Sequence, residues 1–310
     1  MINLSQSERN PGLSLLLVIV FALAGLFVFQ FVSAGIVLPL MGFSLNELGD
    51  IMSNPTAYPS FRAPLVIMQG IISVGAFIVA PLYYIWRYEN ADFQPYFDYK
   101  EIDAKPAILT VLLVLSFMMV NSLFIEWNLN VQFPDFMSSF AQWARKKEDE
   151  LLILTDFITY FESTGYFVLV FIVVAIVPAL GEELLFRGLI QKYFVQISGN
   201  IHIAIWTSAL LFSAFHMQFY GFVPRLLLGA FFGYLLAYSG NLIYAMIAHF
   251  INNGITLLMV YLYQKGAIEF DIENTESVPL ESVAIFFIIG AVLFIVFRNH
   301  FSSRNKPTHE

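Results

Sequence analysis

The chain contains no cysteine and few charged residues. Without cysteine it forms no disulfide, carries no thiolate nucleophile and offers no thiolate ligand to a metal. Only 12% of its 310 residues are charged, about half of the roughly 25% that is typical of a soluble domain. Hydrophobic residues make up 58% of the chain, and 33 residues are phenylalanine. These values predict an integral membrane protein without a soluble domain of useful size.

Other features that the sequence lacks narrow the possible folds and functions of this membrane protein. The apolar residues form long continuous runs and not short alternating segments, which predicts membrane helices and not an outer-membrane barrel. The net charge of −8 argues against nucleic acid as a partner. No internal repeat relates the two halves, whereas secondary transporters commonly have one. The lipid bilayer is the partner that composition implies, and the oligomeric state stays open.

We predict an all-α, polytopic membrane protein with about eight transmembrane helices and an active site inside the helical bundle. The expected spans are 12–38, 64–86, 107–125, 166–186, 201–220, 223–238, 242–263 and 282–297. They divide the chain into N-terminal helices (1–125), an amphipathic or extramembrane connector (126–165), a core of four helices (166–263), and a last helix with a polar tail (264–310). The connector is either a solvated helix or an element that gates or guides a substrate.

Eight spans place both termini on one side of the membrane. Nine of the 15 lysine and arginine residues fall on that side: Arg9, Arg87, Lys100, Lys105, Arg187, Lys192, Arg298, Arg304 and Lys306. Because short cytoplasmic loops are enriched in these residues, we expect both termini in the cytoplasm and the protein in the cytoplasmic membrane.

Two carboxylates and an arginine stand at the end of an uncharged apolar run. Val168 to Leu180 carries no charge, and Glu182, Glu183 and Arg187 follow it. Ionisable groups at membrane depth are costly and usually serve a site. Residues four apart share a helix face, so Glu183 is expected to pair with Arg187, whereas Glu182 points about 100° away and stays free. The alternative is a salt bridge at the membrane surface.

Two later spans carry histidines. His216 ends a Phe-Ser-Ala-Phe-His sequence, and His249 lies four residues before Asn253, on the same helix face. If the fourth span continues to residues 198–199, Glu182 and His216 both lie about 24 Å from that turn and meet at similar depth. A lone histidine in a membrane helix usually makes an interhelical hydrogen bond. Together with the carboxylates, the two histidines favour a site.

The order of these motifs resembles a known family. Glu-Glu-x-x-x-Arg at 182–187, Phe-x-x-x-His at 212–216 and His-x-x-x-Asn at 249–253 are similar to the motifs of the CPBP family, which comprises CAAX-prenyl-proteases and bacteriocin-processing (Abi) proteins. The resemblance covers about Tyr166 to Tyr263. It implies an endopeptidase that cuts membrane-associated, for example prenylated or CAAX-like, proteins or peptides.

The resemblance also implies roles for the six residues. Glu182 is the expected general base on water, supported by Glu183 and Arg187. His216, His249 and Asn253 are expected to bind or polarise the scissile carbonyl, the water or a metal.

The need for a metal is open at this stage. The family has been described both as metalloproteases and as metal-independent glutamate proteases. Zinc or another divalent metal could take His216, His249 and Glu182 or Glu183 as ligands, with water as the fourth. The chain has no His-Glu-x-x-His motif, and one glutamate cannot easily be both ligand and base. We therefore favour a water activated by glutamate without a required cofactor.

Two other functions use the same residues. A non-catalytic bacteriocin-immunity or scaffold protein could keep the fold without the reaction. A proton-coupled transporter could use Glu182, Glu183, His216 and His249 as a relay. The full set of expected catalytic residues favours the endopeptidase.

Overall fold

The computed structural model describes residues 10–89, 102–269 and 278–304, and every regular element in these ranges is helical. Seven helices are long and apolar enough to cross a membrane, and an eighth apolar helix, Ile201–Phe215, is shorter. The predicted all-α, polytopic fold is confirmed. Three of the residues counted for the orientation, Arg9, Lys100 and Lys306, lie outside the described ranges.

The elements follow the predicted spans with shifted ends. In chain order they are α1 (Pro11–Met41), α2 (Leu45–Ser53), α3 (Arg62–Val74), α4 (Ala80–Tyr84), α5 (Ala104–Leu129), α6 (Ser138–Thr159), α7 (Thr164–Phe171), α8 (Val177–Glu183), α9 (Gln191–Ser198), α10 (Ile201–Phe215), α11 (Phe222–Ser239), α12 (Leu242–Gln264) and α13 (Leu280–Arg304). Short π-helical segments join α3 to α4 and α7 to α8 to α9, so each group forms one continuous span.

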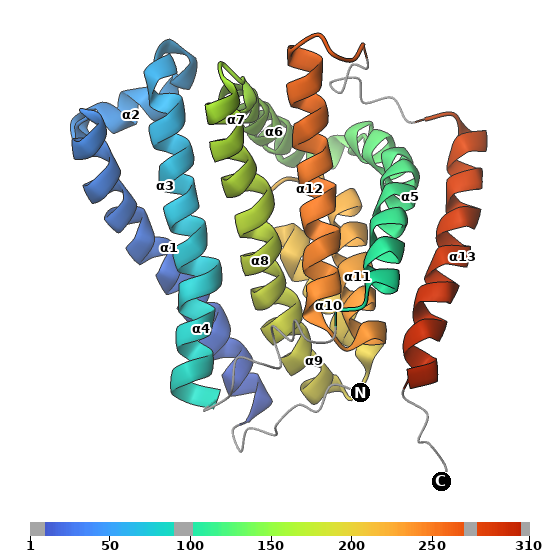
Figure 1. Ribbon diagram of the computed structural model, residues 1–310. Coiled ribbons are helices and arrows are strands. Elements are labelled where there is room, and N and C mark those ends of the chain that lie inside the picture. The colour runs from blue at the N-terminus through green and yellow to red at the C-terminus, as the bar shows by residue number, and fades with distance from the viewer. Residues whose placement is uncertain (1–9, 90–101, 270–277, 305–310) are drawn as a thin grey trace.

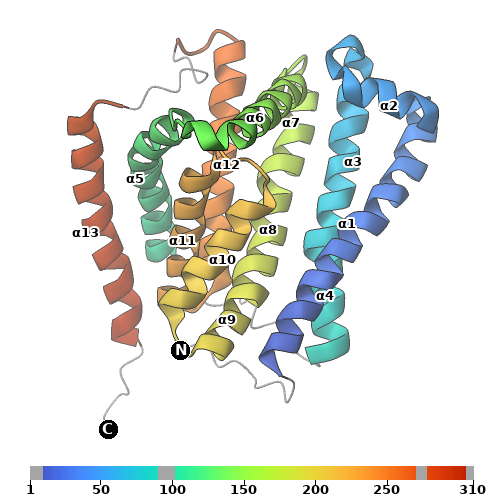
Figure 2. The same ribbon diagram turned by 180° about the vertical axis from the view of Figure 1, so that it is seen from behind.

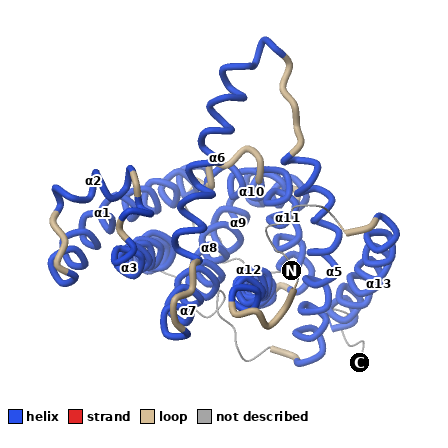
Figure 3. The backbone as a smooth tube through the Cα atoms, turned by 90° about the horizontal axis from the view of Figure 1, so that it is seen from above, coloured by secondary structure: helices blue, strands red, loops and turns tan. Residues whose placement is uncertain are grey.

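The spans stand side by side, with α1 to α4 at one edge and α13 at the other (Figure 1). Seen from above, α8 to α12 cluster between these edges (Figure 3). The fourth span has 44% of its most apolar stretch buried, against 11% for α13. The motif-bearing helices therefore form the interior of the bundle.

The two ends of the bundle differ. Helix α1 begins and α13 ends at the same end, as an even number of crossings requires (Figure 1). Helix α6 lies across the opposite end, crosswise to the spans (Figure 2). It carries the central part of the predicted connector.

The fourth span is an interrupted helix. The π-helical segments Ile172–Ile176 and Leu184–Ile190 flank α8, which carries both glutamates. Pro178 has no N–H to donate to the carbonyl four residues earlier, that of Val174. The side-chain Nδ2 of Asn253 donates to this carbonyl at 3.1 Å. A backbone acceptor that proline leaves free thus fixes α12 against the fourth span.

Two span ends and part of the charge count were wrong. The fourth span does not end near Phe186 but continues to Ser198, where Gly199 adopts the left-handed conformation that closes a helix. The fifth ends at Phe215 and not at Tyr220. Hydropathy misplaced both ends because it reports composition and not hydrogen bonding. Arg187 and Lys192, counted as loop charges, are consequently buried within the fourth span.

Candidate active site

Glu183 is the centre of a buried hydrogen-bond network. Its side chain is fully buried, and its Oε1 accepts hydrogen bonds from Arg187 Nη1 and from His249 Nδ1, each at 2.8 Å. The first bond is the predicted pair within the fourth span, and the second joins that span to α12. Since a carboxylate can only accept here, Nδ1 of His249 carries a proton, and in the neutral imidazole Nε2 then carries the lone pair.

Arg187 contacts α10 and α11 in addition to Glu183. Its guanidinium lies over the Phe212 ring, 4.4 Å from the centroid, and Nη2 donates to the carbonyl of Gly229 at 2.9 Å. A Cβ at Gly229 would stand 3.0 Å from Nη2 and 3.1 Å from the Phe212 ring. Glycine at this place in α11 therefore leaves the room in which the guanidinium sits. With only 1% of its surface exposed, Arg187 neutralises Glu183 and does not face solvent.

Glu182 has different surroundings from its neighbour. Its side chain keeps 14% exposure, and none of the hydrogen bonds found in the described residues occupies its carboxylate. Oε2 lies 4.0 Å from His249 Nε2. Two acceptors at this separation are too far apart to bond each other but can both bind one water at about 2.8 Å. The geometry thus provides a place for a water between a carboxylate and an imidazole.

His216 closes α10 beside the same aromatic ring. Its Nδ1 donates to the Phe212 carbonyl at 2.8 Å, which leaves Nε2 with the lone pair. The Phe212 ring centroid lies 5.0 Å from that of His216 and 6.2 Å from that of His249. The two histidines therefore flank one phenylalanine.

The loop after His216 is anchored from α5. Met217 follows with φ of 54°, a strained value for a residue with a side chain. The buried Asn128 donates through Nδ2 to the Phe219 carbonyl at 3.2 Å, and its Oδ1 accepts from the Val223 N–H at 2.9 Å. Both ends of the turn are thus fixed, which holds His216 in place.

Asn253 forms a hydrogen bond with the fourth span, and none of the hydrogen bonds found in the described residues joins it to the predicted charged residues. One N–H of its amide binds Val174, and its Oδ1 accepts from Asn252 Nδ2 at 3.1 Å. As predicted, it shares with His249 the face of α12 that meets the fourth span. Its amide keeps a second N–H.

The geometry does not fit a zinc site. A catalytic zinc needs three protein ligands that converge, plus water. Within the described ranges, no three histidine, aspartate or glutamate side chains are placed to hold a metal ion. Glu183 Oε1 and His249 Nδ1 are hydrogen-bonded to each other and are not available as metal ligands, and His249 Nε2 points toward Glu182. We therefore derive no chemical step through a metal.

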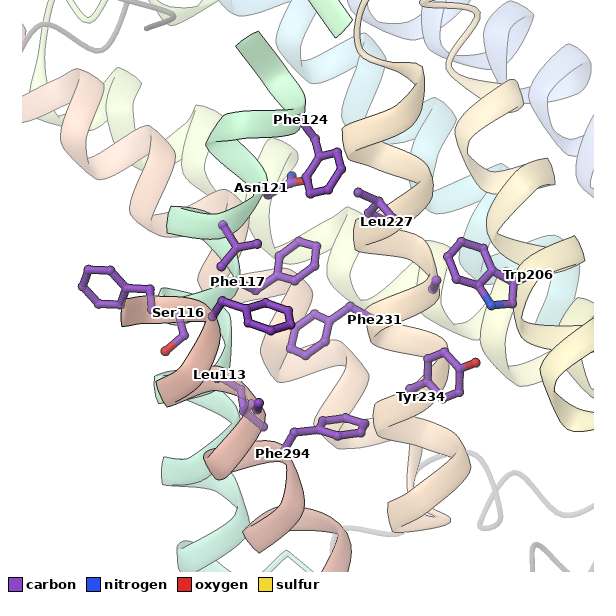
Figure 4. A pocket seen from close by; sticks show the side chains of 16 residues that line it. Leu113, Ser116, Phe117, Asn121, Phe124, Trp206, Leu227, Phe231, Tyr234 and Phe294 are labelled. Atoms are coloured by element: carbon purple, nitrogen blue, oxygen red, sulfur yellow. The ribbon is translucent and has the colours of Figure 1, made fainter. Parts of the chain in front are cut away.

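A cavity of about 360 Å³ lies apart from this network, among α5, α10, α11 and α13. None of the six predicted site residues lines it. Figure 4 shows Phe117 and Phe231 at its middle, and their rings are stacked with centroids 4.7 Å apart. Its walls are almost wholly apolar, so it offers no groups for peptide hydrolysis.

Comparison with known proteins identifies the motif-bearing segment. Residues 164–255 match the family model Rce1-like, described as type II CAAX prenyl endopeptidase Rce1-like. This segment is similar in sequence to the type II CAAX prenyl endopeptidases. The match supports the family that the three motifs resemble, and all six predicted site residues lie within it. No curated protein and no solved structure gave a match.

The match and the apolar helices together support a general class. The helices indicate an integral, multi-pass membrane protein, and residues 164–255 are similar to the intramembrane CAAX-type endopeptidases. A protease embedded in a membrane would act on membrane-associated substrates in the lipid bilayer.

Sequence reasoning missed one charged residue of this region. Arg225, in the first turn of α11, interacts electrostatically with Glu182. It offered the same signal as the glutamates, a charge at the start of an apolar helix, but the orientation count treated it as a loop residue. The roles of Gly229 and Asn128 could not be inferred from the sequence, because these roles depend on contacts with helices that are distant in sequence.

Proposed function

We propose that the protein hydrolyses a peptide bond of a membrane-associated, CAAX-like protein or peptide, with a water activated by Glu182. The observation that supports this proposal is that the two adjacent carboxylates have different surroundings. Glu183 is neutralised by Arg187 and binds His249, whereas the Glu182 carboxylate is free and lies 4.0 Å from the lone pair of His249 Nε2.

The water is held by both of its hydrogens. One O–H donates to Glu182 and the other to His249 Nε2, so an oxygen lone pair is left to attack the scissile carbonyl carbon. Glu182 takes the first proton as the C–O bond forms. The same carboxyl then gives that proton to the leaving amine as the C–N bond breaks. Glu183 keeps the imidazole in the required tautomer, as carboxylates do for catalytic histidines.

The carbonyl oxygen needs a donor as negative charge develops on it. We propose Asn253 for this role. The free N–H of the Asn253 amide can donate directly. The neutral His216 ring donates through Nδ1 to the Phe212 carbonyl and can only accept at Nε2, so we propose that it binds the water or the substrate N–H.

Replacing Glu182 tests the proposed base. The full chain is purified in lipid nanodiscs and assayed with a farnesyl-cysteine peptide that ends three residues later. Glu182→Gln keeps the shape of the side chain and removes the base, so we expect a loss of activity of roughly 10²–10⁴-fold. His249→Ala is expected to lose activity as well. Glu281→Gln, at an exposed position in the first turn of α13, is the control and should retain full activity.

Three measurements test the identity of the base, the need for a metal and the identity of the substrate. Cleavage by Glu182→Gln at the rate of the parent would rule out Glu182 as base. Loss of parental activity after chelation, with recovery on adding zinc, would show a metal-dependent reaction. Capture of membrane proteins by the inactive Glu182→Gln variant, followed by their identification, would define the natural substrate.

A further inference from the structure

Arg225 is a cation that the proposed mechanism does not use. It lies in the first turn of α11, five residues before Ala230 enters the packed interior. Its Nη2 donates to Gln218 Oε1 at 2.6 Å. Its Nη1 is buried and has no hydrogen-bond partner among the described residues. One arm of this guanidinium is therefore turned inward and left without an acceptor.

The local chain makes room for this arrangement. The guanidinium folds back over Gly221, and a Cβ at Gly221 would stand 3.0 Å from Nη2. Gly221 and Gln218 both belong to the loop that follows His216. Because Asn128 fixes that loop, Arg225 is held in position and does not extend freely into solvent.

Arg225 lies near both the active site and the connector helix. Its guanidinium is close enough to interact electrostatically with Glu182, His216 and Glu148 of α6. Yet the described part of the chain contains no ion pair to Arg225, and Glu148 Oε2 is likewise buried without a hydrogen bond. Arg225 and Glu148 are therefore opposite charges that interact over a distance and form no ion pair with each other.

Such an arrangement suits an anion that arrives with the substrate. A buried cation without a bonded partner is costly, and a guanidinium fork matches the two oxygens of a carboxylate. A peptide cut near its end brings one obligatory anion, its C-terminal carboxylate. Without a cation at this point, Glu182 and Glu148 would repel that carboxylate.

We propose that Arg225 binds the C-terminal carboxylate of the peptide substrate. This inference rests on the proposed peptidase function. Arg225 is then a substrate-binding residue that contributes to affinity, whereas Glu182 carries the chemistry.

The test compares two peptides that differ in one group. A farnesyl-cysteine peptide with three further residues is made with a C-terminal carboxylate and with a C-terminal amide, and both are assayed with the full chain in nanodiscs. The parent should prefer the carboxylate peptide in kcat/KM by roughly 30-fold or more, as expected when one partner of a buried charge pair is lost. Arg225→Gln should raise KM for the carboxylate peptide to the value for the amide, with little change in kcat. Arg225→Lys should retain part of the preference.

Glu148→Gln is the control for a purely structural role. It removes the charge that Arg225 faces on α6 and should keep the preference for the carboxylate peptide. If Arg225 only anchored α6, Glu148→Gln and Arg225→Gln would weaken cleavage of both peptides alike. If Arg225 stabilised the oxyanion, Arg225→Gln would lower kcat equally for both. Either result overturns the proposal.

A binding measurement distinguishes failure of this proposal from failure of the proposed peptidase reaction. Labelled carboxylate and amide peptides are titrated onto Glu182→Gln and onto Glu182→Gln/Arg225→Gln. Tighter binding of the carboxylate peptide that disappears with Arg225 supports the proposal, even if the parent cleaves neither peptide and the proposed function fails. Equal binding of both peptides by Glu182→Gln contradicts it, even if the parent cleaves them.

Discussion

At the scale of single residues, Glu182 and Glu183 are neighbours in sequence with opposite roles. Glu183 is fully buried and bonded to a cation and an imidazole, so its charge is balanced and its position fixed. Glu182 keeps partial exposure and only a long contact to His249. Removing Glu183 should therefore affect the fold first, and removing Glu182 the chemistry first.

The buried pair can be tested by a double-mutant cycle. Glu183→Gln leaves Arg187 buried without its carboxylate and should lower the free energy of unfolding by about 3–5 kcal/mol. Arg187→Met should have a similar effect. The double variant Glu183→Gln/Arg187→Met should lose less than the sum of the two, because neither charge is left alone. Unfolding in mixed micelles measures all three.

The control for this cycle is Glu182→Gln. It should change the free energy of unfolding by no more than about 1 kcal/mol. Strictly additive losses in the cycle would show that Glu183 and Arg187 stabilise the protein independently and not as a pair.

At the scale of elements, α6 is the helix whose charges face the site from outside the membrane spans. Burial is the main cause that raises the pKa of Glu148, while Arg225, the Tyr220 backbone and Arg145 act in the opposite direction and Asp149 adds to the rise. A carboxyl group with a raised pKa binds its proton more tightly in the folded state than in the unfolded state. It therefore favours folding at low pH, and this contribution is lost as pH rises through the folded pKa.

The substitution Glu148→Gln should reveal how this contribution to stability depends on pH. At pH 7 to 8 the variant avoids the buried charge and should unfold at a temperature roughly 1–2 °C higher than the parent. Near pH 4, where the carboxyl group of the parent is protonated, the gain should vanish. Thermal unfolding across pH measures the difference, with Asp156→Asn, at an exposed position of the same helix, as control. A gain that persists unchanged at low pH would mean that charge is not its cause.

At the scale of the whole molecule, the bundle places α6 and the turn after α9 at opposite ends (Figure 1). The start of α1 and the end of α13 share the end that carries the α9 turn. The predicted cytoplasmic location of the termini would therefore put α6 on the outer side. This orientation stays a prediction, and burial of Arg187 and Lys192 within the fourth span weakens the charge count behind it.

The absence of cysteine makes the orientation easy to measure. Ser139→Cys in α6 and Ser198→Cys at the end of α9 replace exposed serines in an otherwise cysteine-free chain. In intact cells, a membrane-impermeant maleimide should label Ser139→Cys at once and Ser198→Cys only after permeabilisation. The reverse pattern would place the termini outside and α6 in the cytoplasm.

The amino-acid sequence by itself determined the membrane class and the approximate positions of the helical spans, and it named six candidate residues for the site. Long apolar runs can satisfy their backbone in a bilayer only as helices or closed barrels, and a spacing of four fixes a helix face. The Glu183–Arg187 pair could therefore be predicted, because both partners lie on one helix.

Only the tertiary structure decided which residues meet across helices. It brought His249 to Glu183, gave Asn253 the carbonyl that Pro178 leaves free, and placed Arg225 near both Glu182 and Glu148. Each of these contacts depends on how far one helix slides and turns against another. That relation is set by the packing of all the spans together, with glycines such as Gly229 where side chains must pass, and no local pattern encodes it.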